Sequence, residues 1–569
     1  MENLGRGVAA VRANETAILV SWRLLGLDPD GIGFNVYRAS GNGDAEKLNG
    51  EVLTKGTNFV DDDANSEADN TYHVRTVVDG EEGDKSGSFT LSGDHEVEPV
   101  IRIPLEDTGN IKYAWVGDLD GDGEYDYVVD RTGDQQAIEA YHRNGTLLWT
   151  VDLGANSENQ NNISPGSTAI SVGNWDGVTV YDFDSDGRAE VALRIANGVT
   201  FGDGESFKHD NDDEQFIAFL DGETGALLSK AEIPTDYIED GPLASRLGVG
   251  YLDGKTPYLV AFMKNRQESG DFNLIYAAYT FDGEASMAWK WLRGDQKLSD
   301  GHNGRIVDAD RDGVDEIHEI GFTLNGDGTL KYSLRDYDII HGDRFYVAKI
   351  DPDQDGLQGY GIQQDNENLI TDYYYDAAEG KVIWTHKGDE VYDVGRGVIG
   401  DIDPTSPGLE VWHFDGVWSA LENESLTNSS LYPWPQMTIL WDGDELAELF
   451  NDGKVEKWDY ENPSVPRSVP RIFKVGDYGG VTVGNGNPIF IGDILGDWRE
   501  EFITINSDST ELLVFTTNEP TDIRLYTLAH NPAYRNDMTL KGYMQSHYVD
   551  YYLGADMSTP DQPDIKYVE

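Results

Sequence analysis

The sequence has 569 residues, and its 105 acidic residues against 42 lysines and arginines give a formal net charge of −63. Nucleic acids and anionic membranes are bound by clustered basic side chains, so this charge excludes both as partners, and no apolar run of about 18 residues is present that would span a membrane. The absence of cysteine excludes disulfides and thiol catalysis.

Two features concentrate the negative charge: short aspartate repeats with metal-ligand spacing, and runs such as Asp61–Asp63 and 210–214. Such runs are commonly a solvated surface. The alternative is a marine or halophilic source, where salt screens their repulsion. The charge favours a monomer. The first residues, Met1–Gly5, lack the basic and apolar segments of a signal peptide, so no signal peptide is expected in this chain. We expect a secreted or cell-surface location.

The first part of the chain, residues 1–95, has the pattern of a small antiparallel sandwich. Residues 16–22, 33–38 and 71–78 read as strands separated by turn-rich stretches. Trp22 and the later Tyr-x-Val pattern resemble a fibronectin type III domain. This likeness concerns the fold and carries no chemistry.

Residues 97–569 repeat one theme, an apolar strand followed by an Asp-rich turn and another apolar strand. The repeats are separated by roughly 45 to 70 residues, the range in which four short strands form one propeller blade. About eight such anchors predict an all-β chain with an eight-bladed β-propeller over these residues. Helical periodicity is scarce, and residues 445–450 are the best helix candidate.

Three of the turns carry acidic residues at relative positions 1, 3, 5 and 9, with glycine at position 6. Each could be a plain Asp-Gly turn, but three carboxylates on alternate positions of a tight loop converge on one point and suit Ca²⁺. The spacing is not that of an EF-hand, because Val129 stands at position 12 of the first turn. We expect several structural Ca²⁺ ions. The candidate ligands are Asp118, Asp120, Asp122 and Asp126; Asp182, Asp184, Asp186 and Glu190; and Asp308, Asp310, Asp312 and Glu316.

A looser turn supplies three more candidate metal ligands, Asp401, Asp403 and Glu410. Its counterpart at residues 349–358 has Lys349 in place of the first acid and a glutamine in place of the last. We predict that the Lys349 ammonium replaces the ion and pairs with an aspartate at position 351 or 353.

The scarce basic residues mark the candidate chemistry. His302 and Arg305 lie just before one Asp-rich turn, and His341, Asp343 and Arg344 lie just before the next. Equivalent strand ends in neighbouring blades would bring the two histidines together with Asp343, as a metal site or an acid–base set. The alternative is a pair of hydrogen-bonded structural histidines.

Arg396 stands between two glycines in the segment Asp393–Gly397. It is either a group that acts on a substrate or one half of an ion pair that locks a blade.

Several motifs together resemble polysaccharide lyase family eleven, the rhamnogalacturonan lyases. The likeness runs from end to end of the chain. The family implies a fibronectin-like domain, an eight-bladed propeller, several Ca²⁺ ions, and β-elimination at a galacturonate linked to rhamnose in an anionic polysaccharide. The motifs are residues 4–8, 20–25, 32–38, 393–397, 496–501 and 524–528.

The resemblance also assigns roles to residues. It implies that Arg396 is the essential arginine, that Tyr543 contacts substrate, and that His302, His341 and Asp343 bind a metal ion. The fourth metal ligand of the family, a glutamate, aligns with Gln364. Among the remaining candidates, Arg305, Arg344 and Asn485 are expected to contact substrate, and His302, His341 or Tyr543 could serve as the base.

Three segments depart from the family pattern. Asn485 stands where the family has a lysine, and the segments 130–134 and 157–162 differ from the substrate loops expected there. Three hypotheses therefore remain: a rhamnogalacturonan lyase with another base, a lyase for another rhamnose-uronate polymer such as ulvan, and a non-catalytic propeller that binds anionic glycans.

Overall fold

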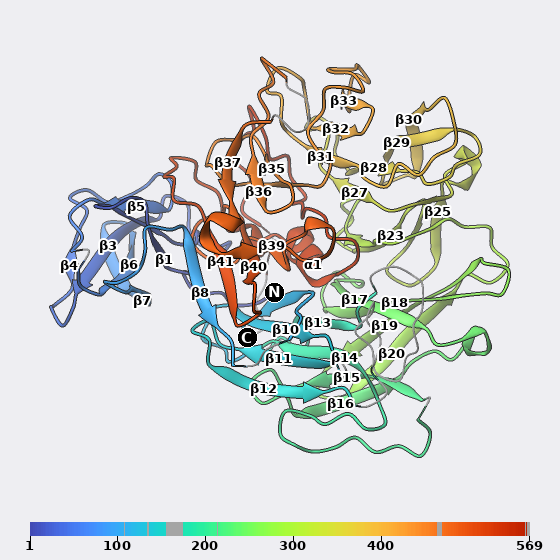
Figure 1. Cartoon of the computed structure of the whole chain (residues 1–569), viewed down its shortest axis with the longest axis horizontal. Coiled ribbons are helices and arrows are strands. Elements are labelled where there is room, and N and C mark those ends of the chain that lie inside the picture. Colours follow the sequence, from blue (N-terminus) through green and yellow to red (C-terminus); the bar gives the residue numbers. More distant parts are fainter. Residues whose placement is uncertain are drawn as a thin grey trace.

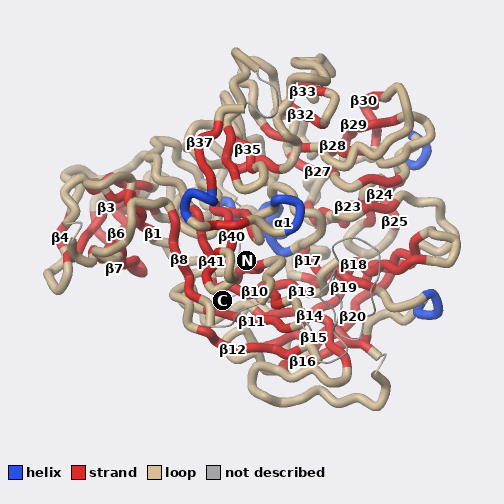
Figure 2. The backbone as a smooth tube through the Cα atoms, in the orientation of Figure 1, coloured by secondary structure: helices blue, strands red, loops and turns tan. Residues whose placement is uncertain are grey.

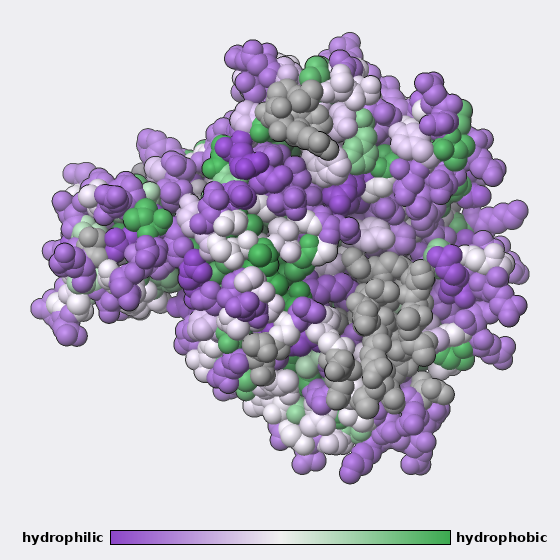
Figure 3. Space-filling view, viewed as in Figure 1, coloured by the Kyte–Doolittle hydropathy of each residue, from purple (hydrophilic) through white to green (hydrophobic). Residues whose placement is uncertain are grey.

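The structure is a computed structural model. It describes residues 1–569 except 66, 107–108, 134–135, 155–156, 158–174, 213, 464–468, 564 and 566–569. Strands account for most of the regular structure (Figure 2), so the expected all-β class is confirmed. No helix in the described ranges is long and apolar enough to cross a membrane. On the face drawn in Figure 3 hydrophilic side chains predominate, in keeping with the acidic composition.

The N-terminal part consists of two antiparallel sheets that lie to one side of the rest (Figure 1). The predicted strands are present, and the side chains of Val20, Trp22, Phe34, Val36 and Tyr72 from both sheets share one core. One sheet contains β1 (Ala9–Arg12), β2 (Ile18–Ser21) and β5 (Asn58–Asp61); the other contains β4 (Glu46–Lys47), β3 (Gly33–Ser40), β6 (Asn70–Val78) and β7 (Glu81–Leu91).

Beyond residue 97 the described strands form successive antiparallel sheets in chain order, as alternating apolar strands and tight turns dictate. The first three sheets contain β9 (Ala114–Gly117), β10 (Asp126–Arg131), β11 (Ala137–Tyr141) and β12 (Leu147–Asp152); β13 (Val178–Tyr181), β14 (Glu190–Ala196), β15 (Gln215–Leu220) and β16 (Leu227–Glu232); and β17 (Ala244–Gly250), β18 (Tyr258–Arg266), β19 (Phe272–Phe281) and β20 (Ala285–Leu292).

The following sheets keep the same order. They contain β22 (Arg305–Val307), β23 (Glu316–Glu319), β24 (Phe322–Leu324) and β25 (Leu330–Ser333); β27 (Phe345–Ala348), β28 (Gln358–Ile362), β29 (Ile370–Asp376) and β30 (Lys381–Lys387); β31 (Val398–Gly400), β32 (Glu410–His413) and β33 (Gly416–Ser419); and β34 (Met437–Ile439), β35 (Glu448–Phe450), β36 (Lys454–Glu456) and β37 (Arg471–Lys474).

One further sheet joins distant parts of the chain. In it β8 (Val100–Pro104) pairs with β41 (Glu511–Phe515), and β41 pairs with β40 (Glu501–Asn506). Strands β38 (Gly480–Val481) and β39 (Phe490–Gly492) both pair with β40. A separate pair, β21 (Asp300–Gly301) and β26 (His341–Gly342), is parallel. The 3₁₀ turns are η1 (Ile238–Asp240), η2 (Arg335–Tyr337), η4 (Val475–Tyr478), η5 (Gly484–Gly486) and η6 (Leu528–His530).

The predicted helix at 445–450 is wrong. This segment enters strand β35, and the Glu448 carboxylate accepts hydrogen bonds from the backbone N–H groups of Trp441 and Asp442 at 2.7 and 2.9 Å, which holds a turn instead. The α-helix of the described residues is α1 (Pro532–Thr539), with Asn531 accepting a bond from the Tyr534 N–H as its N-cap.

A buried ion pair joins α1 to the start of the chain at the centre of the large part (Figure 1). Arg535 donates to both carboxylate oxygens of Glu2, at 2.6 and 2.8 Å, and the two residues are 1% and 2% exposed. Its Nη2 also reaches the carbonyls of Val116 and Val180 at 3.3 Å each, on strands β9 and β13. One guanidinium therefore fixes the N-terminal segment, α1 and two sheets.

The candidate active-site residues and the Asp-rich turns lie at opposite ends of the first strand of a sheet. His302 precedes β22, His341 precedes β27 and Arg396 precedes β31, whereas the Asp-rich turns follow these strands. Because each short strand connects the two, the histidines and Arg396 share one edge of the sheets, and the turns share the other.

We expect Glu2→Ala to lower the free energy of unfolding by about 3–5 kcal/mol, because it leaves the Arg535 charge buried and unpaired. Chemical denaturation measures this. Glu223→Ala is the control: it removes a pair with Arg188 whose side chains are both 50% exposed, and a change within about 1 kcal/mol is expected there. Equal losses in the two variants would contradict a central role for the buried pair.

Candidate active site

The parallel pair β21–β26 brings the two predicted histidines together. Asp300 lies opposite His341 in this register, and the ring centroids of His302 and His341 are 5.3 Å apart. Close approach of the backbones requires glycine at position 342, because a Cβ there would lie 2.0 Å from the Ile362 carbonyl oxygen.

Asp343 completes a cluster of possible metal ligands. One ligand atom from each of His302, His341 and Asp343 lies within 4.8 Å of the others, and the His302 Nε2 to Asp343 Oδ1 distance is 3.7 Å. Burial, and then the charge of Asp393, raise the pKa of Asp343 to about 6. The group is therefore costly to keep ionised without a cation nearby.

Asp300 orients His341. The His341 Nδ1 lies 2.7 Å from the Asp300 carbonyl oxygen and 2.8 Å from its carboxylate, which leaves Nε2 as the available ligand atom. Burial opposes ionisation of Asp300, but Lys264 and the other cations around it outweigh burial and hold its pKa below the usual range. This is the arrangement by which carboxylates orient metal-binding histidines.

Tyr543 comes from the segment after α1 and faces the histidines. Its ring centroid is 4.8 Å from that of His302. Burial, followed by the charges of Asp343 and Asp393, raises the pKa of Tyr543 to about 12. The phenol therefore keeps its proton at neutral pH and can donate it.

Arg396 is partly buried and keeps a free donor. Its Nη1 is buried without a hydrogen-bond partner among the described residues, and no carboxylate of the described part forms an ion pair with it. The alternative of a blade-locking ion pair is therefore not seen there. Burial, and then Arg344, lower the pKa of Arg396 to about 10, which leaves it charged at neutral pH.

Two of the predicted substrate contacts are buried arginines. Arg305 is 3% exposed and pairs with Asp537 of α1, and its Nη2 donates to the Val347 carbonyl at 3.1 Å. The expectation that Arg305 contacts substrate is corrected on this ground: its guanidinium is already used in the core. Arg344 is 5% exposed and donates to the Gln436 carbonyl, so it acts on the site through its charge rather than by direct contact.

Gln364 and Asn485 both lie beside the site. The Gln364 side chain donates from Nε2 to Asp393 at 3.2 Å, which leaves its carbonyl oxygen as a possible ligand. Asn485 is exposed, and its carbonyl lies 3.5 Å from Arg396 Nη2. Its φ of 64° is a left-handed conformation that asparagine tolerates better than lysine. Asp134 and residues 158–162 of the departing segments lie outside the described residues.

Hydrogen bonds from backbone N–H groups to carboxylates hold the Asp-rich turns together. The ninth-position acid accepts a backbone N–H with one oxygen, as in the 2.8 Å bond from Phe183 to Glu190. Other oxygens, Asp126 Oδ2, Asp401 Oδ1 and Glu410 Oε1, are buried without a hydrogen-bond partner. Burial, followed by neighbouring acids such as Asp184, raises the pKa of Glu190 to about 9. Orphaned oxygens and disfavoured ionisation both fit a bound cation.

Lysine ammonium groups occupy two of the turns, but Lys349 is not among them. Lys331 Nζ lies 2.6 Å from both Asp310 and Glu316 in the third turn. Lys349 forms no ion pair in the described part, so its predicted pairing is wrong; Gln358 accepts the turn's N–H groups there instead.

In the turn between β34 and β35, the ammonium group of one lysine contacts three carboxylates. Lys457 Nζ lies 2.9 Å from Asp442 and 2.8 Å from Asp444, and it also contacts Glu448. The carboxylates are arranged as in the Asp-rich turns, so the ammonium stands where an ion would stand.

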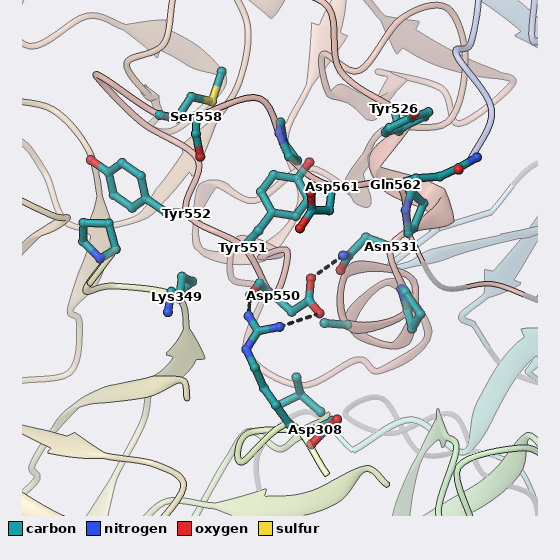
Figure 4. A pocket seen from close by; sticks show the side chains of 18 of the residues that line it. Asp308, Lys349, Tyr526, Asn531, Asp550, Tyr551, Tyr552, Ser558, Asp561 and Gln562 are labelled. Atoms are coloured by element: carbon teal, nitrogen blue, oxygen red, sulfur yellow. Dashed lines mark hydrogen bonds and ion pairs between the residues drawn. The ribbon is translucent and has the colours of Figure 1, made fainter. Parts of the chain in front are cut away.

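A large cavity lies on the turn side of the sheets, away from the histidines. It encloses about 1240 Å³ and is lined by Asp308, Lys349, Asp550 and the C-terminal segment (Figure 4). Asn531 and Arg311 hold Asp550 within it. We place the chemistry at the histidine cluster, because the groups lining this cavity serve to join turns.

The chain matches two family models that together cover nearly all of it. Residues 1–91 match the model described as Rhamnogalacturonan I lyases beta-sheet domain. Residues 106–563 match Rhamnogalacturonan lyase family 11, C-terminal domain.

Individual relatives match over the full length. Rhamnogalacturonan endolyase YesW of Bacillus subtilis (strain 168) is 32% identical over 99% of this chain and 93% of its own, and exolyase YesX of the same strain is 31% identical over 99% and 97%. The structure of the Bacillus licheniformis PL11 rhamnogalacturonan lyase superposes with a TM-score of 0.86 at 29% identity, over 100% of this chain and 99% of its own.

Lys457→Met tests whether an ammonium replaces an ion. Without calcium we expect the variant to lose about 3–5 kcal/mol of unfolding free energy, because three carboxylates lose their counter-charge. With calcium we expect it to bind one more Ca²⁺ than the parent and to recover stability. Calorimetric titration and thermal unfolding measure both. Lys474→Met, which removes an exposed lysine 3.9 Å from Asp477, is the control; an unchanged Ca²⁺ stoichiometry in Lys457→Met would sink the idea.

Proposed function

Because this chain belongs to rhamnogalacturonan lyase family 11, we propose that it cleaves rhamnogalacturonan by β-elimination, as a carbon–oxygen lyase. The observation that carries the proposal is the positively charged Arg396, with a free donor group, beside the His302–His341–Asp343 cluster. In a chain of net charge −63 this is a place built to receive an anionic sugar.

The reaction breaks the C5–H and C4–O4 bonds, forms the C4=C5 double bond, and leaves a proton on the departing oxygen. A base removes the proton on C5 of the galacturonate, the electron pair forms the C4=C5 double bond, and the C4–O4 bond to the leaving sugar breaks. The leaving oxygen takes a proton. Removal of the C5 proton is difficult because the adjacent carboxylate is already negative, so positive charge must face that carboxylate.

Arg396 supplies this charge. Its guanidinium is partly exposed and can pair with the uronate carboxylate, and the charge of Arg344 adds to the local positive potential. A charged hydrogen bond of this kind strengthens as negative charge builds up on the carboxylate in the transition state.

The histidine cluster is suited to hold a divalent cation. The ligands would be His302, His341 and Asp343 with the carbonyl oxygen of Gln364, and Asp300 fixes the His341 ring for this purpose. When bound, such an ion supplies further positive charge to the substrate carboxylate.

Tyr543 handles the proton of the leaving group in this proposal. Its raised pKa keeps the phenol protonated at neutral pH, and its position against His302 places it in the site. Proton donation to O4 is the step for which a neutral phenol is suited.

We also propose that the sheets close into an eight-bladed propeller. Successive first strands contact each other from β9 to β13, β17, β22, β27, β31 and β34, and β8 completes a sheet with the late strand β41. The buried unpartnered oxygens of the Asp-rich turns support structural Ca²⁺ ions between strands.

Arg396→Ala tests the activity. We expect the parent to release unsaturated uronate from rhamnogalacturonan, measured by ultraviolet absorbance, and the variant to lose at least about 100-fold in kcat, as when an oxyanion-stabilising donor is removed. Arg188→Ala, a half-exposed arginine paired with Glu223, is the control.

The substrate panel includes homogalacturonan and ulvan. Product from ulvan alone would move the proposal to another rhamnose-uronate polymer, and binding without product on all three polymers would replace it with a glycan-binding role.

Calcium and pH are coupled through the turns. The raised pKa of Glu190 means that the calcium-free folded chain holds a proton that the unfolded chain releases near pH 4.5, so without calcium this group's contribution to stability is lost as pH rises from about 4.5 to 9. We expect saturating Ca²⁺ to remove this loss. Denaturation between pH 5 and 9, with chelator or calcium, checks it, and Glu190→Gln should make the fall of stability with pH in chelator less steep.

A further inference from the structure

A second cluster of nitrogen and oxygen ligands lies outside the site described above. Asp372 of β29 stands between His386 of β30 and His413 of β32, on two neighbouring sheets. The Asp372 Oδ2 to His386 Nδ1 distance is 3.1 Å, and the Asp372 Oδ1 to His413 Nε2 distance is 3.3 Å. We propose that these three side chains bind one divalent transition-metal ion of the Zn²⁺ class.

The buried imidazole of His413 faces carboxylates without a well-formed hydrogen bond. Its side chain is 1% exposed, and neither ring nitrogen makes a hydrogen bond within the described part of the chain, although Nε2 lies 3.3 Å from Asp372 and Nδ1 lies 3.9 Å from Asp415. Buried polar atoms are almost always satisfied, so a nitrogen left open toward a carboxylate needs an explanation. A metal ion between the two groups satisfies both.

The hydrogen bonds of His386 restrict its protonation state. Its Nε2 lies 2.7 Å from Asn423 Oδ1, an acceptor, so Nε2 carries the proton of the neutral ring. The contact of Nδ1 with the Asp372 carboxylate at 3.1 Å is then made either by a second proton, which turns the ring into an imidazolium, or by a metal ion bound to both atoms.

The surrounding groups hold each ligand in place. Thr371 donates to Asp372 at 2.8 Å. Trp384 stacks on His386 with ring centroids 4.4 Å apart, and Trp418 stacks on His413 at 5.1 Å. Metal ligands are generally oriented by such neighbours.

The donor set selects the kind of ion. Two imidazoles and one carboxylate suit Zn²⁺ and related ions rather than Ca²⁺, which prefers oxygen alone. Metal–ligand bonds of about 2.0–2.1 Å in a tetrahedron set neighbouring ligand atoms about 3.3 Å apart. The separations of 3.1 and 3.3 Å involve different oxygens of Asp372, and one ligand atom from each of the three residues lies within 4.8 Å of the others, which is close enough for them to share one ion. The ion would tie two neighbouring sheets together.

Co²⁺ is the probe, because a tetrahedral site gives it strong visible absorption. The full chain is stripped with chelator, supplied with excess Ca²⁺ to fill the Asp-rich turns, and titrated with Co²⁺ and then Zn²⁺. His302→Gln serves as the parent for the comparison, so that the active-site cluster does not contribute. We expect one Co²⁺ per chain with visible absorption that Zn²⁺ abolishes.

Two variants in that parent test the ligands. His386→Gln is partly exposed and should fold; His413→Gln is buried and gives independent support if circular dichroism shows it folded. We expect each to weaken Co²⁺ binding at least 10-fold. His209→Gln, a partly exposed histidine 3.6 Å from Glu214, is the matched control and should bind as the parent does.

The proposal is overturned if the parent gives no tetrahedral Co²⁺ signal, or if folded His386→Gln binds Co²⁺ as tightly as the parent. In either case the cluster is a hydrogen-bonded network with His386 protonated.

Discussion

The buried contact between Glu2 and Arg535 is the constraint on which the rest of the large part depends. It fixes α1 against the first strands of two sheets, and α1 in turn carries Asp537, which pairs with Arg305 at the start of β22. His302 lies just before that strand, and Tyr543 follows α1 by a short segment. The position of the site residues relative to each other is therefore set from the centre outward by charges that are paired and desolvated.

Local patterns in the sequence were sufficient for the strands and Asp-rich turns, because alternation and tight-turn chemistry are properties of neighbouring residues. They were insufficient for α1, which is buried along most of its length and whose buried residues include polar ones such as Arg535 and Asp537. The partners of these residues lie hundreds of positions away. A short apolar segment, 445–450, therefore looked more helical than α1 did.

Local patterns likewise identified only some of the candidate site residues. His302, His341 and Asp343 could be paired from their equal positions before two turns, and the structure brings them together. Arg305 and Arg396 looked alike as scarce cations, and only the presence of Asp537 beside Arg305 separates them. The sequence predicted that a lysine replaces an ion in one of the turns, but it named the wrong lysine. Lys331 and Lys457 come from later in their sheets rather than from the turn itself, so the turn sequences did not indicate them.

Because of Lys457, its turn does not depend on an ion from the solution. A turn closed by a bound ion is occupied according to the concentration of that ion, and it opens when the ion is scarce. A tethered ammonium has a fixed, high effective concentration at its three carboxylates, whatever the solution contains. The sheet of β34–β37 thus carries its own counter-ion, and its folding does not have to wait for a diffusing one.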